Sequence, residues 1–119
     1  MRVLGLDHVQ LPIRPGGEEL AREFWHSLLG LDEVAKPSSL AARGGVWFQC
    51  GPQQVHCGVE AEFTSGRRHP ALLVEDLAAV RAALSEARRP VREEPEIPGY
   101  RRLFTDDPFG NRIELMELL

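Results

Sequence analysis

Residues 5–13, with the sequence GLDHVQLPI, predict a β-strand whose two faces differ in character. Side chains alternate between the faces of a strand, so this segment has one apolar face and one face that carries His8 and Gln10. The apolar face consists of Val9, Leu11 and Ile13. That face suits a hydrophobic core, whereas the other places an imidazole and an amide in the middle of the strand. An explanation for His8 on the polar face of this strand would bear on both the fold and the function of the chain.

The composition is that of an ordinary globular domain. The chain has 119 residues, of which 43% are hydrophobic and 27% are charged, and its net charge is −4; this length suffices for one domain with a core. Basic residues are scattered, so we expect neither nucleic-acid nor membrane binding. No apolar stretch approaches the ~20 residues of a membrane span. Two cysteines and no secretory signal favour a reduced, cytoplasmic protein.

The order of the predicted elements occurs twice along the chain. The first half contains the opening strand, a helix over residues 18–29 that ends before Gly30, and strands near 33–35, 46–50 and 53–59. The second half contains a strand over 69–75, a helix from Asp76 to Arg88, and strands over 90–93, 101–105 and 112–117. Both halves therefore predict the order βαβββ. We expect one domain over residues 1–119 with modules of about 1–60 and 67–119.

Four polar residues occupy corresponding positions on four of the predicted strands. They are His8, His56, His69 and Glu114. If the two halves combine into a curved sheet, the four side chains can converge in its hollow. Three imidazoles and a carboxylate suit Zn, Fe, Ni, Co or Mn, and a subset of two histidines and one carboxylate leaves coordination positions open for a substrate. A single histidine on a strand is more often structural, so the prediction depends on the four positions together.

Four segments occur in a fixed order over nearly the whole chain. They read LDHVQLPI, FWHSLLGLDE, HPALLVEDLAAVRAAL and FTDDPFGNRIELMEL. Together they resemble the glyoxalase / bleomycin-resistance / ring-cleaving dioxygenase superfamily, also called the vicinal oxygen chelate proteins. The resemblance implies an α+β fold, in which two βαβββ modules form a curved mixed sheet with helices on its outer face. It also implies a homodimer whose sites lie at the subunit interface.

The resemblance gives the four polar residues specific roles. It implies that His8, His69 and Glu114 bind a divalent metal (Zn, Ni, Co, Mn or Fe) and that His56 is a fourth, optional ligand. In members that resemble glyoxalase I this fourth residue is usually Glu, whose carboxylate can move a substrate proton. His56 could act as a base instead, because imidazole titrates near neutral pH. Catalytic roles are therefore expected for His56 and Glu114.

The resulting hypothesis is a metal-dependent, glyoxalase-like enzyme that acts on a small oxygen-chelating substrate through a stabilised enediolate or alkoxide. Lyase or isomerase chemistry fits best, and transferase and dioxygenase chemistry remain open. The alternatives are a metal-free protein that binds a small molecule such as an antibiotic, and a regulatory or structural subunit. Arg112 shares a strand face with Glu114, and Arg102 lies on the neighbouring strand. Either arginine could select an anionic substrate group, or both could be solvated surface residues.

Overall fold

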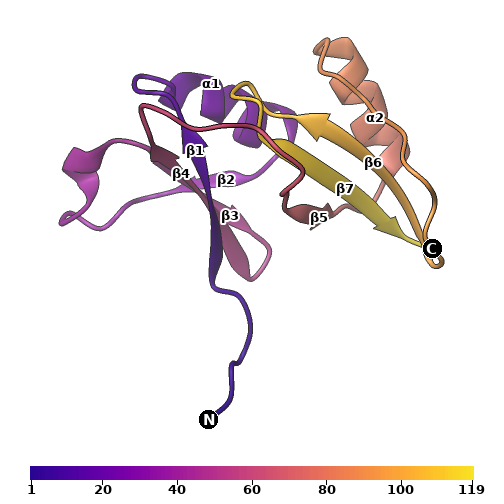
Figure 1. Cartoon of the computed structure of the whole chain (residues 1–119), viewed down its shortest axis with the longest axis horizontal. Coiled ribbons are helices and arrows are strands. Elements are labelled where there is room, and N and C mark those ends of the chain that lie inside the picture. Colours follow the sequence, from indigo (N-terminus) through magenta and orange to yellow (C-terminus); the bar gives the residue numbers. More distant parts are fainter. The chain divides into compact units, whose positions relative to one another are not determined.

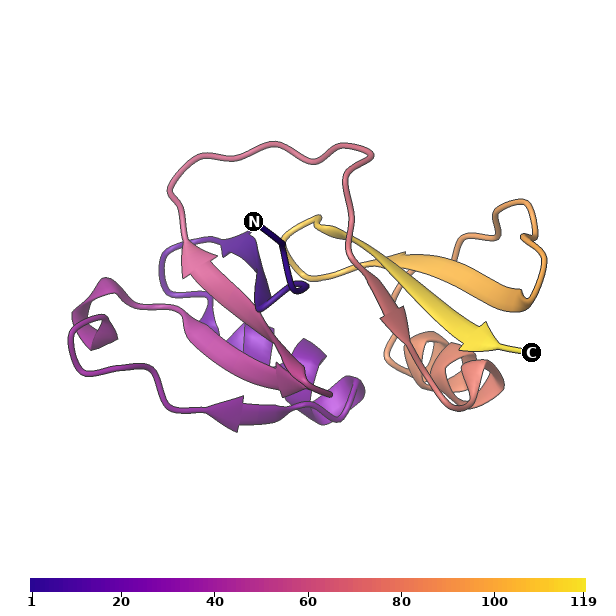
Figure 2. The same ribbon diagram turned by 90° about the horizontal axis from the view of Figure 1, so that it is seen from below.

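The chain forms two compact units, Met1–Phe63 and Thr64–Leu119, in a computed structural model that describes residues 1–119 (Figure 1). Each unit combines one β-sheet with helical segments that lie against one face of that sheet (Figure 2). The α+β class predicted from the sequence is therefore confirmed. None of the helices has the length and apolar character needed to cross a lipid bilayer.

Unit 1 consists of a strand, a helical segment and three further strands. In chain order these are β1 (His8–Ile13), α1 (Glu18–Arg22), the π-helix η1 (Glu23–Leu28), β2 (Asp32–Val34), the 3₁₀-helix η2 (Ala41–Arg43), β3 (Val46–Cys50) and β4 (Gln53–Val59). The strands form one sheet in the order β1-β4-β3-β2. Strands β1 and β4 are parallel, and the other neighbours are antiparallel. The predicted order βαβββ is thus present in unit 1.

Unit 2 has a shorter sheet of three strands. Its elements are β5 (Ala71–Leu73), α2 (Leu77–Glu86), β6 (Tyr100–Asp106) and β7 (Arg112–Leu118), and the sheet order is β5-β7-β6. The strand predicted over residues 90–93 is reduced to a single bridge between Arg92 and Phe104. Both prolines that flank this bridge, Pro90 and Pro95, lack the N–H group that a longer ladder would need.

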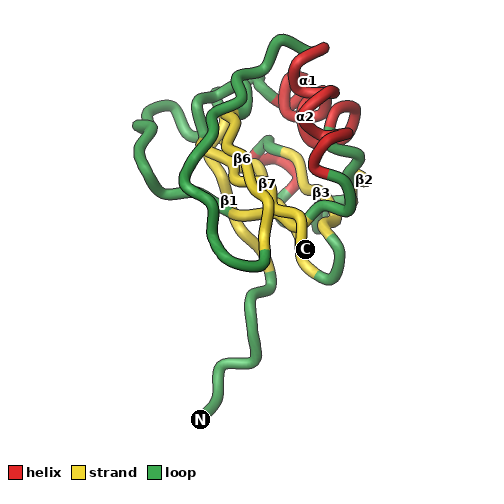
Figure 3. The backbone as a smooth tube through the Cα atoms, turned by 90° about the vertical axis from the view of Figure 1, so that its right-hand side faces the viewer, coloured by secondary structure: helices red, strands yellow, loops and turns green.

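Other boundaries also differ from the prediction. The strand expected over residues 69–75 is limited to β5, so His69 lies in the loop before it. The helix expected over residues 18–29 changes at Glu23 from α to π geometry, with a hydrogen bond of 3.1 Å from the Leu29 N–H to the Phe24 carbonyl. Hydrophobic periodicity does not distinguish one wide turn from an α-helix. The first strand begins at His8, so residues 1–7 form an exposed loop that runs away from the sheet of unit 1 (Figure 3).

The core of unit 1 lies on one face of its sheet, whereas in unit 2 Phe104 is buried on the same face as Glu114, its partner across β6 and β7. In unit 1 the buried residues of this face and of the helical segment are Ile13, Ala21, Phe24, Trp25, Val46, Phe48, Val55 and Cys57. In unit 2 the buried apolar residues are Leu77, Leu84, Leu103, Phe104, Phe109, Ile113 and Leu115. Strand alternation leaves the opposite faces for His8, His56 and Glu114.

A backbone contact in unit 1 fixes the start of α1 against the loop before β3. The Gly45 N–H donates a hydrogen bond of 2.7 Å to Oε2 of Glu18, and this bond is the main reason why the pKa of Glu18 lies below its ordinary value of 4.5. Gly45 has φ of 86°, and a Cβ at this position would clash with the backbone carbonyl of Cys57. Only glycine therefore brings this N–H group to Glu18.

We expect Glu18→Gln to reduce the dependence of unfolding free energy on pH below about pH 4.5. Because the folded state lowers the pKa of Glu18, the stability it contributes is complete above the unfolded-state value and is lost as the pH falls through the folded-state value. At neutral pH the loss should be about 1 kcal/mol. Denaturant unfolding between acidic and neutral pH measures it. Glu23→Gln, an exposed neighbour, is the control; identical pH profiles for both variants would contradict this prediction.

Candidate functional site

Three aromatic rings form a stack on the polar face of unit 1. Trp47 on β3 lies directly opposite His56 on β4, and their rings are parallel within 2° with centroids 3.7 Å apart. The His8 ring, from β1 on the other side of β4, stacks on His56 with a centroid distance of 4.0 Å and an interplanar angle of 18°. The imidazole of His56 is therefore enclosed between two rings.

The environment of His56 favours its neutral form. The residue is only 5% exposed, and burial lowers its pKa below the ordinary value of 6.5. The proximity of His8 lowers the pKa further, and the carboxylate of Asp7 partly opposes this. A neutral imidazole at pH 7 can accept a proton or bind a metal ion.

The stack limits how His8 and His56 can share a ligand. A histidine binds a metal through a nitrogen lone pair that lies in the plane of its ring, and two nearly parallel planes do not direct their lone pairs at one point. His8 lies at the first residue of β1 with its side chain 40% exposed, and its Nδ1 is 2.9 Å from the Asp7 carboxylate. His56 is held by its stacking on Trp47 and by a hydrogen bond of 2.8 Å between its Nε2 and Oε1 of Gln54. Of the two histidines, His8 is the one with freedom to turn.

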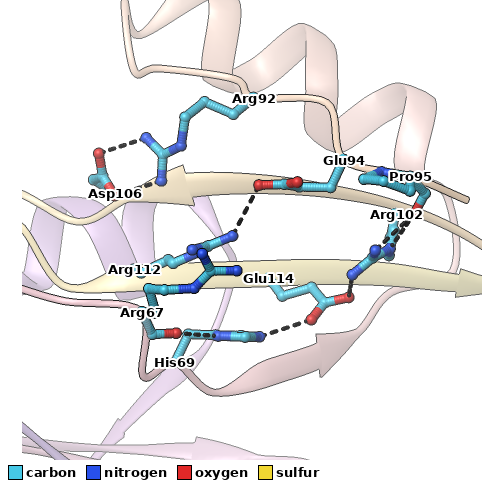
Figure 4. A network of polar contacts seen from close by, with 9 residues as sticks. All are labelled: Arg67, His69, Arg92, Glu94, Pro95, Arg102, Asp106, Arg112 and Glu114. Atoms are coloured by element: carbon cyan, nitrogen blue, oxygen red, sulfur yellow. Dashed lines mark hydrogen bonds and ion pairs between the residues drawn. The ribbon is translucent and has the colours of Figure 1, made fainter.

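Unit 2 brings together the other two predicted ligands, His69 and Glu114 (Figure 4). Nδ1 of His69 lies 2.9 Å from the backbone carbonyl of Arg67. A carbonyl oxygen only accepts, so Nδ1 carries the hydrogen, and Nε2 faces Oε1 of Glu114 at 2.9 Å. This arrangement, with one ring nitrogen donating to a backbone carbonyl and the other directed at a charged group, is typical of histidines that bind metals.

The contact between His69 and Glu114 also suits a cation. The lone pair of a neutral His69 and the carboxylate oxygen would repel each other at 2.9 Å unless a proton lies between them. The position between these two atoms therefore favours positive charge, and a divalent ion could replace the proton. The nitrogen and oxygen donors of unit 2 are ligand types that such metals bind, and a site of three protein ligands needs one more donor.

The two predicted substrate-binding arginines are engaged differently. Arg102 donates from Nη1 to Oε2 of Glu114 at 3.1 Å, and from Nε and Nη2 to the Pro95 carbonyl (Figure 4). It therefore holds Glu114, which is 6% exposed, in a fixed orientation. Arg112 lies with its guanidinium 4.1 Å from the centroid of Phe104, and its Nη2 contacts Glu94 at 3.0 Å. The Nε of Arg112 is buried without a hydrogen-bond partner.

The four predicted ligands thus occur as one pair in each unit, and the structure contains no group of three or more His, Cys, Asp or Glu side chains placed to hold a metal ion.

Sequence reasoning did not identify Trp47 as part of the polar face of unit 1. The two-residue turn at Gly51 and Pro52 fixes the register that pairs Trp47 with His56, so turn length was the signal that could have placed it.

Comparison with known proteins identifies the family. The sequence matches the Glyoxalase/Bleomycin resistance protein/Dioxygenase superfamily over residues 5–115. The crystal structure of a putative glyoxalase family protein from Bacillus anthracis shares 41% sequence identity, with 100% of both chains covered and a TM-score of 0.93. No curated protein sequence matches the chain.

Two more distant structures share the fold. A lactoylglutathione lyase from Agrobacterium tumefaciens is 20% identical, with 98% of this chain and 96% of that chain covered and a TM-score of 0.72. TnmS3, an antibiotic binding protein from Streptomyces sp. CB03234, is 21% identical, with 100% and 99% covered and a TM-score of 0.72. With the match over residues 5–115, the chain belongs to the glyoxalase/bleomycin resistance protein/dioxygenase superfamily, as its sequence motifs predicted.

Proposed function

We propose that this protein is a metal-dependent, glyoxalase-like enzyme that acts on a small oxygen-chelating substrate. The observation that carries the proposal is the pairing of His69 with Glu114. Arg67 fixes the ring nitrogen that remains available, and Arg102 fixes the carboxylate. Such oriented ligands reduce the cost of binding an ion. We propose a divalent cofactor (Zn, Ni, Co, Mn or Fe).

We propose His8 as the third ligand. Its exposed position allows it to turn away from the stack, and it comes from the module of about residues 1–60, whereas His69 and Glu114 come from that of about 67–119. The two modules then act as one glyoxalase-like domain. Ligands from both modules could be supplied by one chain or by two copies in a homodimer. The two free cysteines agree with a cytoplasmic protein.

The remaining polar residues would bind the substrate or transfer its proton. A bound divalent ion would polarise two neighbouring substrate oxygens and stabilise the negative charge of an enediolate or alkoxide. His56, neutral at pH 7, would accept a proton from the substrate, or act as a fourth ligand. Glu114, a carboxylate, is a second candidate for proton transfer, because its Oε1 is directed at a ring nitrogen of His69 at 2.9 Å. Arg112 would contact an anionic group of the substrate through the outer end of its guanidinium, whose Nη2 now contacts Glu94. Lyase or isomerase chemistry suits these groups best, with transferase and dioxygenase chemistry as further options.

One observation supports the alternative of a metal-free small-molecule binding protein. Trp47 and His8 enclose His56, and the partly exposed rings of these two outer residues could stack on a planar ligand without any metal. The fold is also compatible with this function, because the antibiotic binding protein TnmS3 shares it.

Titration of the chelator-stripped protein with Ni²⁺, Co²⁺, Zn²⁺ and Mn²⁺ tests the proposal. We expect saturable binding of about one ion per chain, together with a rise in Tm, because an ion that binds only the folded state stabilises it. The loaded protein should then isomerise the hemithioacetal of a 2-oxoaldehyde and a thiol, an oxygen-chelating substrate. Absence of saturable binding for all four ions would contradict the proposed metal site and favour a metal-free small-molecule binding protein.

Sedimentation of the same samples tests the homodimer. We expect a dimer at the concentrations at which metal binds. A monomer that binds the metal at full affinity would contradict a site shared between two subunits.

A further inference from the structure

A chain of side-chain amides runs along the polar face of unit 1 and ends at His56. Its fixed end is Gln49, whose Nε2 donates to the backbone carbonyls of Gly51 at 2.8 Å and Gln53 at 3.0 Å. Carbonyl oxygens only accept hydrogen bonds, so the NH₂ end of the Gln49 amide has to face them. The Oε1 atom of Gln49 is thereby directed at Gln54, its partner across β3 and β4.

The orientation of Gln49 determines the orientation of Gln54. Oε1 of Gln49 needs a donor, and Nε2 of Gln54 supplies it at 3.1 Å. The other end of the Gln54 amide, Oε1, then lies 2.8 Å from Nε2 of His56. An amide oxygen only accepts, so Nε2 of His56 has to carry the hydrogen.

We infer that Gln49 and Gln54 form a positioning relay that fixes His56 in the Nε2–H tautomer and makes Nδ1 its reactive nitrogen. The structure gives Nδ1 no hydrogen-bond partner. What Nδ1 does, as base or as ligand, rests on the proposed function; the tautomer itself does not. Neither glutamine touches the substrate in this proposal, since both act through the His56 ring.

The aromatic stack and the relay restrict the ring in complementary ways. Stacking on Trp47 and His8 fixes the plane of the His56 ring. It does not distinguish two orientations related by a half-turn about the Cβ–Cγ bond, which returns the ring to the same plane and exchanges its nitrogen and carbon positions. After such a turn a C–H group would face Oε1 of Gln54, and the hydrogen bond would be lost. The relay therefore selects one of two orientations that the stack alone would allow.

Nuclear magnetic resonance of the ¹⁵N-labelled, metal-free protein tests the relay directly. Two-bond ¹H–¹⁵N correlations of the imidazole distinguish the Nε2–H from the Nδ1–H tautomer, and the signals of His56 are identified by their absence in His56→Phe. We expect the parent protein to contain the Nε2–H form. Gln54→Glu, which can only accept, should keep this form. Gln54→Lys, which can only donate, should convert His56 to the Nδ1–H form.

Two further variants complete the test. Gln49→Leu removes the fixed end of the relay, so the Gln54 amide can turn over and an Nδ1–H population should appear; this variant decides the matter if Gln54→Lys fails to fold. Gln10→Leu, opposite His56 on β1, should leave the tautomer unchanged. An Nδ1–H form in the parent, or an unchanged tautomer in folded Gln54→Lys and Gln49→Leu, would overturn the inference. Because the protein is metal-free throughout, failure of the relay is distinguishable from failure to bind metal.

Discussion

Replacing Glu114 with Gln is expected to weaken divalent-metal binding by about 100-fold or more while the fold survives. The substitution preserves the shape of the side chain and removes its charge, and mutation even of residues that only orient a ligand typically costs 10–100-fold in metal affinity. The fold should tolerate the change, because Arg102 keeps its bonds to the Pro95 carbonyl. Calorimetric titration of chelator-stripped protein with Ni²⁺ or Co²⁺ measures the affinity, and thermal unfolding measures the fold.

Matched variants show whether the loss is specific. Glu94→Gln makes the same change in charge on the partner of Arg112 and should leave the affinity for metal within a few-fold of the parent. His8→Ala should weaken binding as Glu114→Gln does, whereas His26→Ala, an exposed histidine on η1, should not. Full metal occupancy in both Glu114→Gln and His8→Ala would reject the proposed site. Loss of folding in both variants would identify a structural polar cluster instead.

Replacing Arg102 with Met is expected to destabilise the metal-free protein by about 3 kcal/mol. The Glu114 side chain is 7% exposed, and removal of its guanidinium partner leaves a buried carboxylate with only His69 beside it. A divalent ion should recover most of this loss, because it supplies the missing positive charge. Denaturant unfolding with and without Ni²⁺ measures both effects.

Arg112→Met is the matched control for Arg102→Met. Its ion pair with Glu94 is more exposed, so we expect a loss of only about 1 kcal/mol, from the pair and from the contact with Phe104. That loss should not depend on metal. If the two variants lose the same stability, or if Ni²⁺ restores neither, Arg102 does not position Glu114.

Much of the fold could be predicted because local chemistry determined it. The bounds of β3 and β4 match their predicted ranges, since a two-residue turn separates two apolar rows of alternating side chains. The Asp76 cap before α2 was also predicted, and its carboxylate accepts from the Ala79 N–H at 3.1 Å. The π-helix was not predicted, because its apolar spacing resembles that of an α-helix.

The sequence predicted which face of a sheet the site residues occupy, but not which groups their side chains contact. Strand alternation placed His8 and His56 on one face of unit 1, yet it gives no information on the ring planes, and the rings stack. The sequence placed Arg102 only on the strand next to that of Glu114, and the carbonyl that holds Arg102 belongs to Pro95, outside any strand. Contacts that depend on irregular backbone have no periodic signal in a sequence.

The separation of core and polar face has an evolutionary consequence. In unit 1 the apolar row lies on the face opposite His8 and His56. In unit 2 the row Leu103, Ile113 and Leu115 lies opposite Glu114, and only Phe104 is buried on the side of Glu114. Mutations can therefore exchange polar side chains with little effect on these apolar rows, and each module can gain or lose its polar residues independently. Such a scaffold is highly evolvable. A lactoylglutathione lyase and an antibiotic binding protein on this same fold agree with that expectation.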